Sequence, residues 1–367
     1  MPATAAQGPA RAAGSASPHW AARIEDAAHA VVVRVLRRRG WQPRVLPYTG
    51  YGGAGWARVL GRVLLCPPGT GVRELERSRG WRRFLSAAVS GVEVDVVIGS
   101  CRTTVTSERG GYLDAVLASD LPPGWGQARL STGAVTSRAP LCVVGQQAGL
   151  GVVSDIDDTV MVTAIPRPLL AFWNTFVRHE SSRRPVPGMA QLYRRIIAEE
   201  PDGFVVYLST GAWNVAPALA AFLARHDFPP GPLLMTDWGP TPHAWFRSGR
   251  EHKRTQLRRL MAELPHLRWL LVGDDGQHDP QLYQEAAAAA PGRVRAVAIR
   301  QLTPSQQVLA HGTLDPLPDG STGPQPSYTG VPEVRAPDGN GLLSALSRTG
   351  ALDSPHHPAP GGGHSDE

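Results

Sequence analysis

The chain has 367 residues with a formal net charge of +6, and 42% of its residues are hydrophobic. This length favours two domains with additional segments, and the hydrophobic content suffices for sizeable cores. No stretch stays apolar over the ~18 residues that a membrane-spanning helix needs, and the three cysteines form no C-x-x-C pair, which argues against a disulfide framework or a structural zinc site.

Charge is distributed unevenly along the chain. Residues 301–367 carry two arginines and seven acids, a balance of −5, which leaves +11 for residues 1–300. The positive charge of residues 1–300 favours binding of anionic partners such as phosphates, acidic lipid or nucleic acid. Lys253 is the only lysine among the 37 basic residues, so we treat its position as a candidate for function.

The first part of the chain predicts a disordered start, one helix and a series of short strands. Residues 1–18 are rich in Ala, Gly, Ser and Pro, which is typical of disorder. A helical pattern over 19–39 ends in RRRG, where the glycine can stop the helix. Strand patterns separated by turn signals then lie at 59–65, 92–98, 103–107, 112–118, 127–131 and 139–145. We expect an N-terminal helix and a smaller antiparallel β-sandwich domain over 19–148.

From residue 149 onward, buried strands alternate with helices. The run GVVS precedes a polar loop, and further strand patterns lie at 203–210, 268–276 and 294–300. Helical patterns lie at 188–200, 216–226, 253–264 and 280–290. This alternation predicts a doubly wound parallel sheet with right-handed crossovers over 149–302. Residues 303–367 are rich in Pro, Gly, Ser and Asp and predict a flexible tail.

A cluster of carboxylates follows the first of these buried strands. The run DIDDT occupies residues 155–159. In an open parallel sheet, ligands bind beyond the carboxyl ends of the strands. Crowded carboxylates repel one another and need a compensating cation, for which Mg²⁺ is the natural choice. An Asp-rich turn that caps a helix is the alternative, whereas a calcium loop fails because Val160 and Pro166 occupy its Gly and Glu positions.

Three further motifs lie at later strand and helix ends. Ser209-Thr210-Gly211 ends the second strand, where a hydroxyl can bind a phosphoryl oxygen or simply cap the strand. Lys253 opens a helix, where an ammonium can neutralise a carboxylate and a phosphoryl group or lie in solvent. The run GDDGQHD, residues 273–279, ends the third strand and can complete a metal site, although a GDD turn is common.

Acid cluster, hydroxyl, lysine and second acid cluster follow in an order that resembles the haloacid dehalogenase phosphatase superfamily. This resemblance implies a haloacid-dehalogenase-like Rossmannoid sheet and a covalent mechanism. Asp155 would be the nucleophile, Asp157 the general acid and base, and Ser209 and Lys253 would hold phosphoryl oxygens. The implied substrate contacts are Thr159, Thr210 and Gly211, and the implied Mg²⁺ ligands are Asp155, Asp157 through its main-chain carbonyl, Asp274 and Asp279.

A narrower resemblance covers roughly residues 45–302. The segments DIDDTVMVT, VPGMAQLY, VVYLSTGAWN, HKRTQL, LVGDDGQHDPQLYQEAA and RVRAVAIR are similar to the catalytic domain of the actin-patch-associated phosphatidate phosphatase family and its bacterial relatives. The preceding β-rich region is similar as well. The resemblance implies Mg²⁺-dependent hydrolysis of phosphatidic acid to diacylglycerol and phosphate through an aspartyl-phosphate.

Residues 164–184, AIPRPLLAFWNTFVRHESSRR, mix apolar and aromatic residues with arginine. Such a segment can contact an acidic membrane surface, or it can form a buried helix. We expect a cytoplasmic protein that can lie peripherally at the inner face of the membrane. The alternatives are a phosphatase of a soluble phosphomonoester and a catalytically silent module that binds acidic lipid. No nucleic-acid partner is expected because no recognised motif is present, and no protein partner is indicated.

Overall fold

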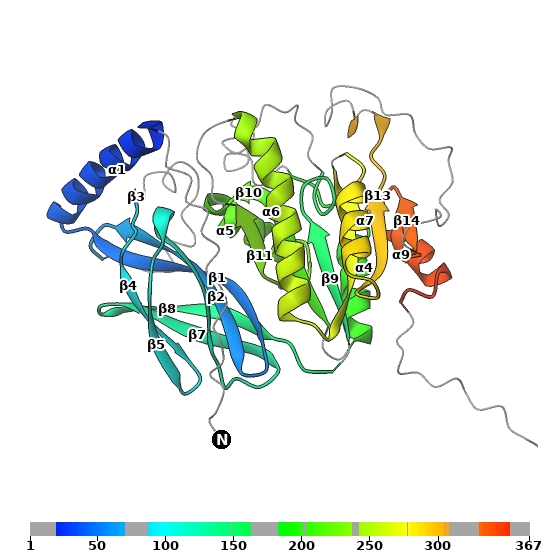
Figure 1. The fold of residues 1–367 in the computed structure, drawn as a ribbon, viewed down its shortest axis with the longest axis horizontal. Helices are drawn as coiled ribbons and strands as arrows, with labels where there is room; N and C mark the ends of the chain where they lie inside the picture. Colours follow the sequence, from blue (N-terminus) through cyan, green and yellow to red (C-terminus); the bar gives the residue numbers. More distant parts are fainter. Residues whose placement is uncertain are drawn as a thin grey trace, which may run out of the picture.

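The structure is a computed structural model that describes residues 20–69, 87–147, 149–162, 183–200, 203–236, 242–276, 278–304, 306–307 and 330–352. Figure 1 shows a curled sheet beside a sheet that is covered by helices. The N-terminal segment that was predicted to be disordered, residues 1–18, lies outside the described residues.

The N-terminal region begins with α1 (Trp20–Arg38) and continues into one curled, mixed sheet. Its strands are β1 (Gln42–Gly53), β2 (Trp56–Cys66), β3 (Ala87–Ala88), β4 (Glu93–Ile98), β5 (Cys101–Thr106), β6 (Tyr112–Ala118), β7 (Gly124–Thr132) and β8 (Val135–Val143), with the short helix η2 (Arg109–Gly111) between β5 and β6. The strand order is β3-β2-β1-β8-β7-β4-β5, and β6 pairs with β2.

The expectation of an antiparallel sandwich is wrong in two respects. Residues 50–52 of β1 pair in parallel with residues 141–143 of β8, so the sheet is mixed. The strands also form one sheet, in which β5 lies against β6. A sheet that curls on itself covers its own apolar face, so it needs no second sheet. That inner core includes Val59, Val96 and Leu130, all at most 1% exposed.

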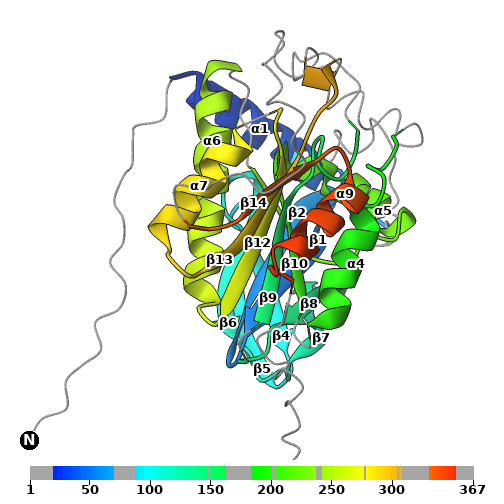
Figure 2. The same ribbon diagram turned by 90° about the vertical axis from the view of Figure 1, so that its right-hand side faces the viewer.

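The C-terminal region is the predicted parallel sheet with helices on both faces. Its elements are β9 (Gly149–Asp155), α4 (Met189–Glu199), β10 (Phe204–Ala212), η4 (Trp213–Val215), α5 (Ala216–Arg225), β11 (Leu233–Thr236), α6 (Pro242–Glu263), β12 (Leu267–Asp274), α7 (Asp279–Ala289), β13 (Val294–Arg300), β14 (Glu333–Ala336) and α9 (Gly339–Arg348). Figure 2 shows α6 and α7 on one face and α4, α5 and α9 on the other. Runs such as Val152–Val153 and Leu270–Val272 are fully buried because both faces are covered.

The strand order of this sheet is β11-β10-β9-β12-β13-β14, and all described pairings are parallel. Counted along the chain from β9, this is the order 3-2-1-4-5-6 of a doubly wound sheet. In that order the direction of winding reverses between β9 and β12. In doubly wound sheets, the loops that leave two such strands diverge, and ligands bind in the crevice at this point.

The predicted flexible tail, 303–367, is wrong for part of its length. β14 pairs in parallel with β13, and α9 packs against α4 and β14. Asp338 caps α9, because its carboxylate accepts a hydrogen bond from the Gly341 amide at 2.9 Å. The apolar pattern GLLSALS, residues 341–347, forms the buried face of α9, whereas the added strand β14 comes from the preceding residues 333–336. The remaining residues of that range are described only at 303–304, 306–307, 330–332, 337–338 and 349–352.

Candidate active site

The carboxyl ends of β9 and β12 bring two acid clusters together at the crevice. Asp155 is the last residue of β9 and Asp274 the last residue of β12. The pairing of Val272 with Ser154 places the two strand ends side by side. The sequence predicted this convergence from the strand patterns, and both carboxylates are at most 1% exposed.

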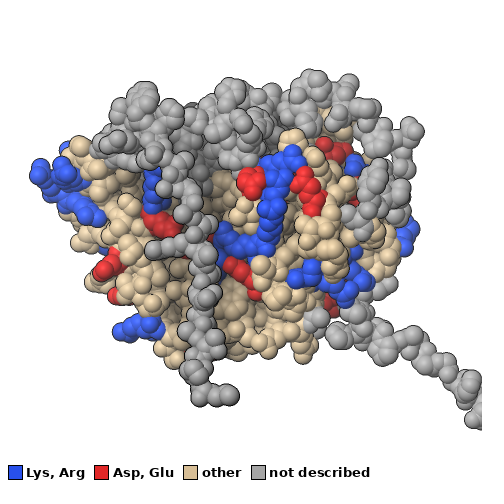
Figure 3. Space-filling model, in the orientation of Figure 1, with Lys and Arg blue, Asp and Glu red and all other residues tan. Residues whose placement is uncertain are grey.

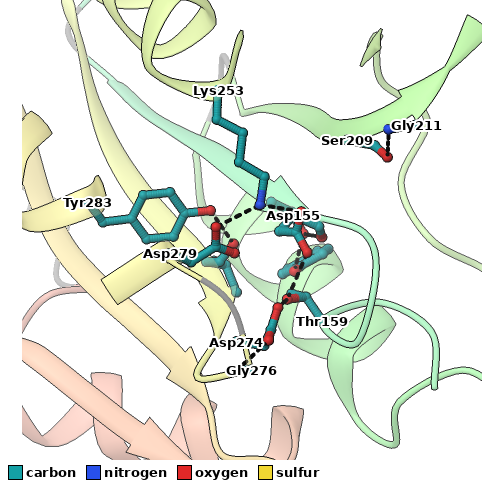
Figure 4. A network of polar contacts seen from close by, with 12 residues as sticks. Asp155, Thr159, Ser209, Gly211, Lys253, Asp274, Gly276, Asp279 and Tyr283 are labelled. Carbon is teal, nitrogen blue, oxygen red and sulfur yellow. Dashed lines mark hydrogen bonds and ion pairs between the residues drawn. The ribbon is translucent and has the colours of Figure 1, made fainter. Parts of the chain in front are cut away.

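Lys253 joins the two clusters from above the sheet. Its Nζ lies 2.7 Å from Asp155 Oδ1 and 2.6 Å from Asp279 Oδ1 (Figure 4). Only 3% of Lys253 is exposed, so the alternative of a lysine in solvent is wrong. Lys253 lies within α6 rather than at its first turn, because the helix begins at Pro242.

Three carboxylates share a small space. Asp155, Asp274 and Asp279 each offer one oxygen such that these oxygens lie within 4.8 Å of one another. Thr159 Oγ1 lies between two of them, 3.5 Å from Asp155 Oδ2 and 3.4 Å from Asp274 Oδ2. The Gly276 amide donates a 2.7 Å hydrogen bond to Asp274 Oδ1, which orients that carboxylate.

The electrostatics of this cluster are dominated by burial. Burial raises the pKa of Asp155 to about 8, since the effect of Lys253 in lowering it is opposed by Asp279 and Asp157. Burial and the neighbouring Asp279 and Asp155 raise the pKa of Asp274 well above its usual range. Burial lowers the pKa of Lys253, but Asp155 and Asp279 more than offset this, and the net shift is upward. One ammonium therefore does not compensate the three carboxylates.

The donor set fits a small, hard divalent cation. Asp279 Oδ2 is buried and has no hydrogen-bond partner among the described residues. A buried carboxylate oxygen without a partner is costly, and a cation would satisfy it. Carboxylate oxygens are the ligands that Mg²⁺ prefers in proteins. The Asp157 carboxylate is not one of the three clustered groups.

The rest of the DIDDT run is also buried and held in place. Asp157 and Asp158 are 8% and 4% exposed. Asp158 has a φ of 58°, a left-handed conformation that Asp tolerates better than most residues, and Arg300 donates a hydrogen bond to its carbonyl oxygen. Arg183, from the segment after the DIDDT loop, lies near the charges of Asp157 and Asp158. The sequence motifs did not indicate a role for Arg300 in supporting this loop.

The predicted hydroxyl motif lies on the neighbouring strand β10. Leu208 pairs with Asp155, so Ser209 follows the position beside the carboxylate. Ser209 is fully buried, and its Oγ accepts a 3.0 Å hydrogen bond from the Gly211 amide. Figure 4 shows this pair to one side of the carboxylate cluster. The described contacts do not link Ser209 directly to Lys253 or to the acids.

Sequence reasoning missed Thr236, the last residue of β11. Its Oγ1 donates to the carbonyl oxygens of Thr210 and Gly211, at 2.9 Å and 3.1 Å. Thr236 is 7% exposed and fixes the backbone that follows Ser209. Only the stretch MTD marks its position in the sequence, and that stretch resembles no motif. The segment 164–184 lies outside the described residues except for Arg183 and Arg184.

Residues 150–301 match the family model for the catalytic domain of phosphatidate phosphatase APP1. Over this segment, which is less than half of the chain, the protein is similar to that catalytic-domain family. The match contains the acid clusters, the Ser209 motif and Lys253. The matched range ends one residue after β13 and does not include β14 or α9.

Two curated relatives match the same part of the chain. Phosphatidate phosphatase APP1 of Saccharomyces cerevisiae is 24% identical over 153 residues, which are 41% of this chain and 26% of that protein. An uncharacterised protein of Schizosaccharomyces pombe is 24% identical over 155 residues, which are 42% of this chain and 25% of that protein. The chain therefore spans about a quarter of the length of these relatives.

Among solved structures, a carbohydrate acetylesterase from Xanthomonas citri shares 10% identity over 74% of this chain and 73% of that one, with a TM-score of 0.27. A similarity of this size carries no argument about fold or function. Among the described helices, none combines the length and the apolar character that crossing a bilayer requires.

Proposed function

We propose that this protein is a Mg²⁺-dependent phosphatase of the haloacid dehalogenase type, which hydrolyses phosphatidic acid to diacylglycerol and phosphate. One observation carries the proposal: Lys253 contacts both Asp155 and Asp279 beside Asp274, at the crevice of the parallel sheet. These residues lie within the segment that matches the family model for the phosphatidate phosphatase APP1 catalytic domain.

In the first proposed step, Asp155 attacks the phosphorus atom. A bond forms between a carboxylate oxygen and phosphorus, the bond from phosphorus to the glycerol oxygen breaks, and Asp157 gives its proton to that leaving oxygen. Lys253 lies 2.7 Å from Asp155 Oδ1 and can orient the carboxylate while it offsets the repulsion between nucleophile and phosphate. Ser209, Thr210 and Gly211, at the end of the adjacent strand, are proposed to bind phosphoryl oxygens.

In the second proposed step, water releases phosphate from the aspartyl-phosphate. Asp157, now ionised, accepts a proton from the water, whose oxygen bonds to phosphorus while the bond to Asp155 breaks. Asp157 is suited to this exchange because it is buried at 8% exposure in the loop that directly follows Asp155. Thr159, whose hydroxyl lies between Asp155 and Asp274, is proposed to keep these carboxylates in place.

The proposed ligands of the magnesium ion are Asp155, Asp274, Asp279 and the main-chain carbonyl of Asp157. When bound, the ion would supply positive charge to the carboxylates and to the phosphoryl oxygens. The pKa of about 8 at Asp155 supports a requirement for it, because a nucleophilic carboxylate has to be ionised.

A lipid substrate implies contact with a membrane, and α1 offers a suitable surface. Val31 and Val35 are 55% and 41% exposed, on the face of α1 opposite Val33 and Leu36, which pack on the sheet. Exposed arginines lie beside them at positions 34 and 38, and Figure 3 shows basic side chains at the outer end of α1. Apolar groups beside arginine suit the interface of an acidic membrane. α1 and the carboxyl ends of β9 and β10 lie at the same end of the molecule (Figures 1 and 2).

The proposal is tested by measuring phosphate release from several substrates with the full chain. Phosphatidic acid in mixed micelles is compared with a sugar phosphate and a nucleotide, each with Mg²⁺ and with a chelator. We expect Mg²⁺-dependent release that is fastest from phosphatidic acid. Faster release from a soluble phosphomonoester would reassign the substrate. No release from any of them would reject the phosphatase and leave a module that binds acidic lipid.

A further inference from the structure

We infer that the curled sheet is a positioning part of the active site, because it holds both elements that carry the proposed phosphate contacts. One contact holds the segment after Ser209, and another holds α6, which carries Lys253. The inference rests on the proposed function for its meaning, since it assigns a task to the N-terminal region in the same reaction. It makes Tyr48 and Arg58 positioning residues that touch neither substrate nor metal.

The first contact is between Tyr48 of β1 and Trp213 of η4. Their rings are stacked, with centroids 4.7 Å apart and an angle of 19° between the planes. The Tyr48 hydroxyl also donates a 3.2 Å hydrogen bond to the Trp213 carbonyl oxygen. Tyr112 of β6 approaches the same indole from another direction, with centroids 6.4 Å apart. The curled sheet thus holds both the ring and the backbone of Trp213.

The path from Trp213 to Ser209 is short and stiff. Trp213 follows Gly211 by two residues, and the Gly211 amide donates to Ser209 Oγ. Thr236 binds the carbonyl oxygens of Thr210 and Gly211 from the other side. A shift of Trp213 would therefore move the Gly211 amide and with it the hydroxyl of Ser209. The stacking partner from the curled sheet fixes the end of this segment that Thr236 does not reach.

The second contact holds the last turns of α6. The Tyr51 hydroxyl donates a 2.7 Å hydrogen bond to Glu263 Oε2. Arg58 of β2 forms ion pairs with both Glu263 and Asp114, and Arg259 of α6 lies 2.9 Å from Asp114. These groups alternate in charge and come from both regions, so the curled sheet and α6 are joined at several points.

α6 also touches the Ser209 segment directly. A Cβ built on Gly249 would lie 3.1 Å from Thr210 Cγ2, so the helix backbone packs closely against this strand end. Lys253 lies one turn further along the helix. Because the curled sheet contacts the end of α6 and the end of β10, it fixes two sides of the same phosphate site. Simple packing of two domains would not require contacts at these two places.

The experiment compares Tyr48→Leu with Tyr48→Phe in the full chain. Leucine keeps apolar volume but removes both the stacking and the hydrogen bond, whereas phenylalanine keeps the stacking. Amide hydrogen exchange over residues 209–213 is measured together with the inhibition constant for inorganic phosphate. Tyr48→Leu should speed this exchange and weaken phosphate binding, each by about tenfold. Tyr48→Phe should change both by less than about threefold.

Val96→Ala is the matched control for a loss of stability. Val96 lies in the separate core of the curled sheet and is fully buried. This variant should lower the melting temperature without changing exchange at 209–213 or phosphate binding. The inference is overturned if Tyr48→Leu leaves both readouts unchanged, or if Val96→Ala changes them equally. Changed exchange in a protein that releases no phosphate would keep the positioning contact and reject the phosphatase instead.

Discussion

Lys253 Nζ lies 2.7 Å from Asp155 Oδ1, although the two residues come from separate elements, α6 and β9. The same ammonium lies 2.6 Å from Asp279, so one buried cation links the two acid clusters. A compact ammonium can do this because its three hydrogens point to separate acceptors from a single atom. This arrangement makes the lysine the first residue to test.

Lys253→Met should remove this link. We expect phosphate release to fall by about 10²–10³ and the free energy of unfolding in a chelator to fall by about 3 kcal/mol, because the buried carboxylates lose their ammonium. Lys253→Arg should not restore activity, since a planar guanidinium cannot take the same position. Arg254→Met is the control, because Arg254 forms exposed ion pairs with Glu251 and Glu285. A Lys253→Met enzyme with a normal rate would contradict the proposed role.

Asp274→Asn should weaken magnesium binding selectively. The substitution removes one of the three clustered carboxylates and keeps the side-chain volume. We expect the Mg²⁺ concentration for half-maximal phosphate release to rise by about 10–100-fold. Asp275→Asn is the matched control from the adjacent position, because Asp275 accepts a hydrogen bond from the Leu302 amide instead. Equal effects of both substitutions, measured by Mg²⁺ titration, would argue against a metal site at Asp274.

Stability should depend on pH and on Mg²⁺ together. The pKa of Asp155 is raised to about 8 and that of Asp274 is raised well above its usual range. An acid with a raised pKa binds its proton more tightly in the folded state, so the free energy of unfolding falls as pH rises from about 4 toward 8. We therefore expect a lower melting temperature in chelator at about pH 8 than at about pH 6.5.

Excess Mg²⁺ should raise the melting temperature more at the higher of these two pH values, because the carboxylates must ionise to bind it. The pKa of His252, lowered to about 4 by burial, affects stability only below about pH 6.5 and so lies outside this range. A melting temperature that is insensitive to Mg²⁺ at both values would count against the metal site.

The exposed face of α1 should contribute to vesicle binding. The double substitution Val31→Ser and Val35→Ser should weaken binding to vesicles that contain phosphatidic acid by about tenfold. Arg34→Gln with Arg38→Gln should weaken it by a similar factor, and only for acidic vesicles. Val116→Ser is the control, because Val116 is 50% exposed on β6, away from α1. Cosedimentation that is unchanged in both double variants would exclude α1 as the contact.

The parallel sheet and its acid clusters could be predicted because their signals are local. Val152–Val153 and Leu270–Val272 are apolar runs that are buried, and each is followed after one intervening residue by a carboxylate, Asp155 or Asp274. In a parallel sheet such runs end at one edge, so their following residues have to meet. Lys253 was singled out as the only lysine of the chain, and it does contact Asp155, although it lies within α6 rather than at the predicted helix start.

Other elements were missed because tertiary contacts outweigh their local signals. β1 contains Pro43, Pro47 and several glycines, which disfavour a strand. Gly50 is needed there, since a Cβ would lie 2.2 Å from the Arg58 carbonyl oxygen of the paired strand. β14 has only four residues, and its charged Glu333 is buried because Arg335 and Gln284 bind it. The hydrophobic pattern within β1 or β14 does not indicate these contacts, because the contacting residues lie in other parts of the chain.

The edge strand β14 is formed by residues 333–336, well after β13 in the chain, and this has a consequence for any shortened form of the protein. Residues 297–300 of β13 pair with residues 333–336, and a chain cut after Leu302 would leave those backbone groups open to solvent at the rim of an otherwise apolar sheet. Such an open rim can recruit a strand from another molecule. Shortened preparations would then precipitate or form soluble aggregates. A loss of phosphatase activity in them would result from this aggregation rather than from the chemistry of the catalytic carboxylates.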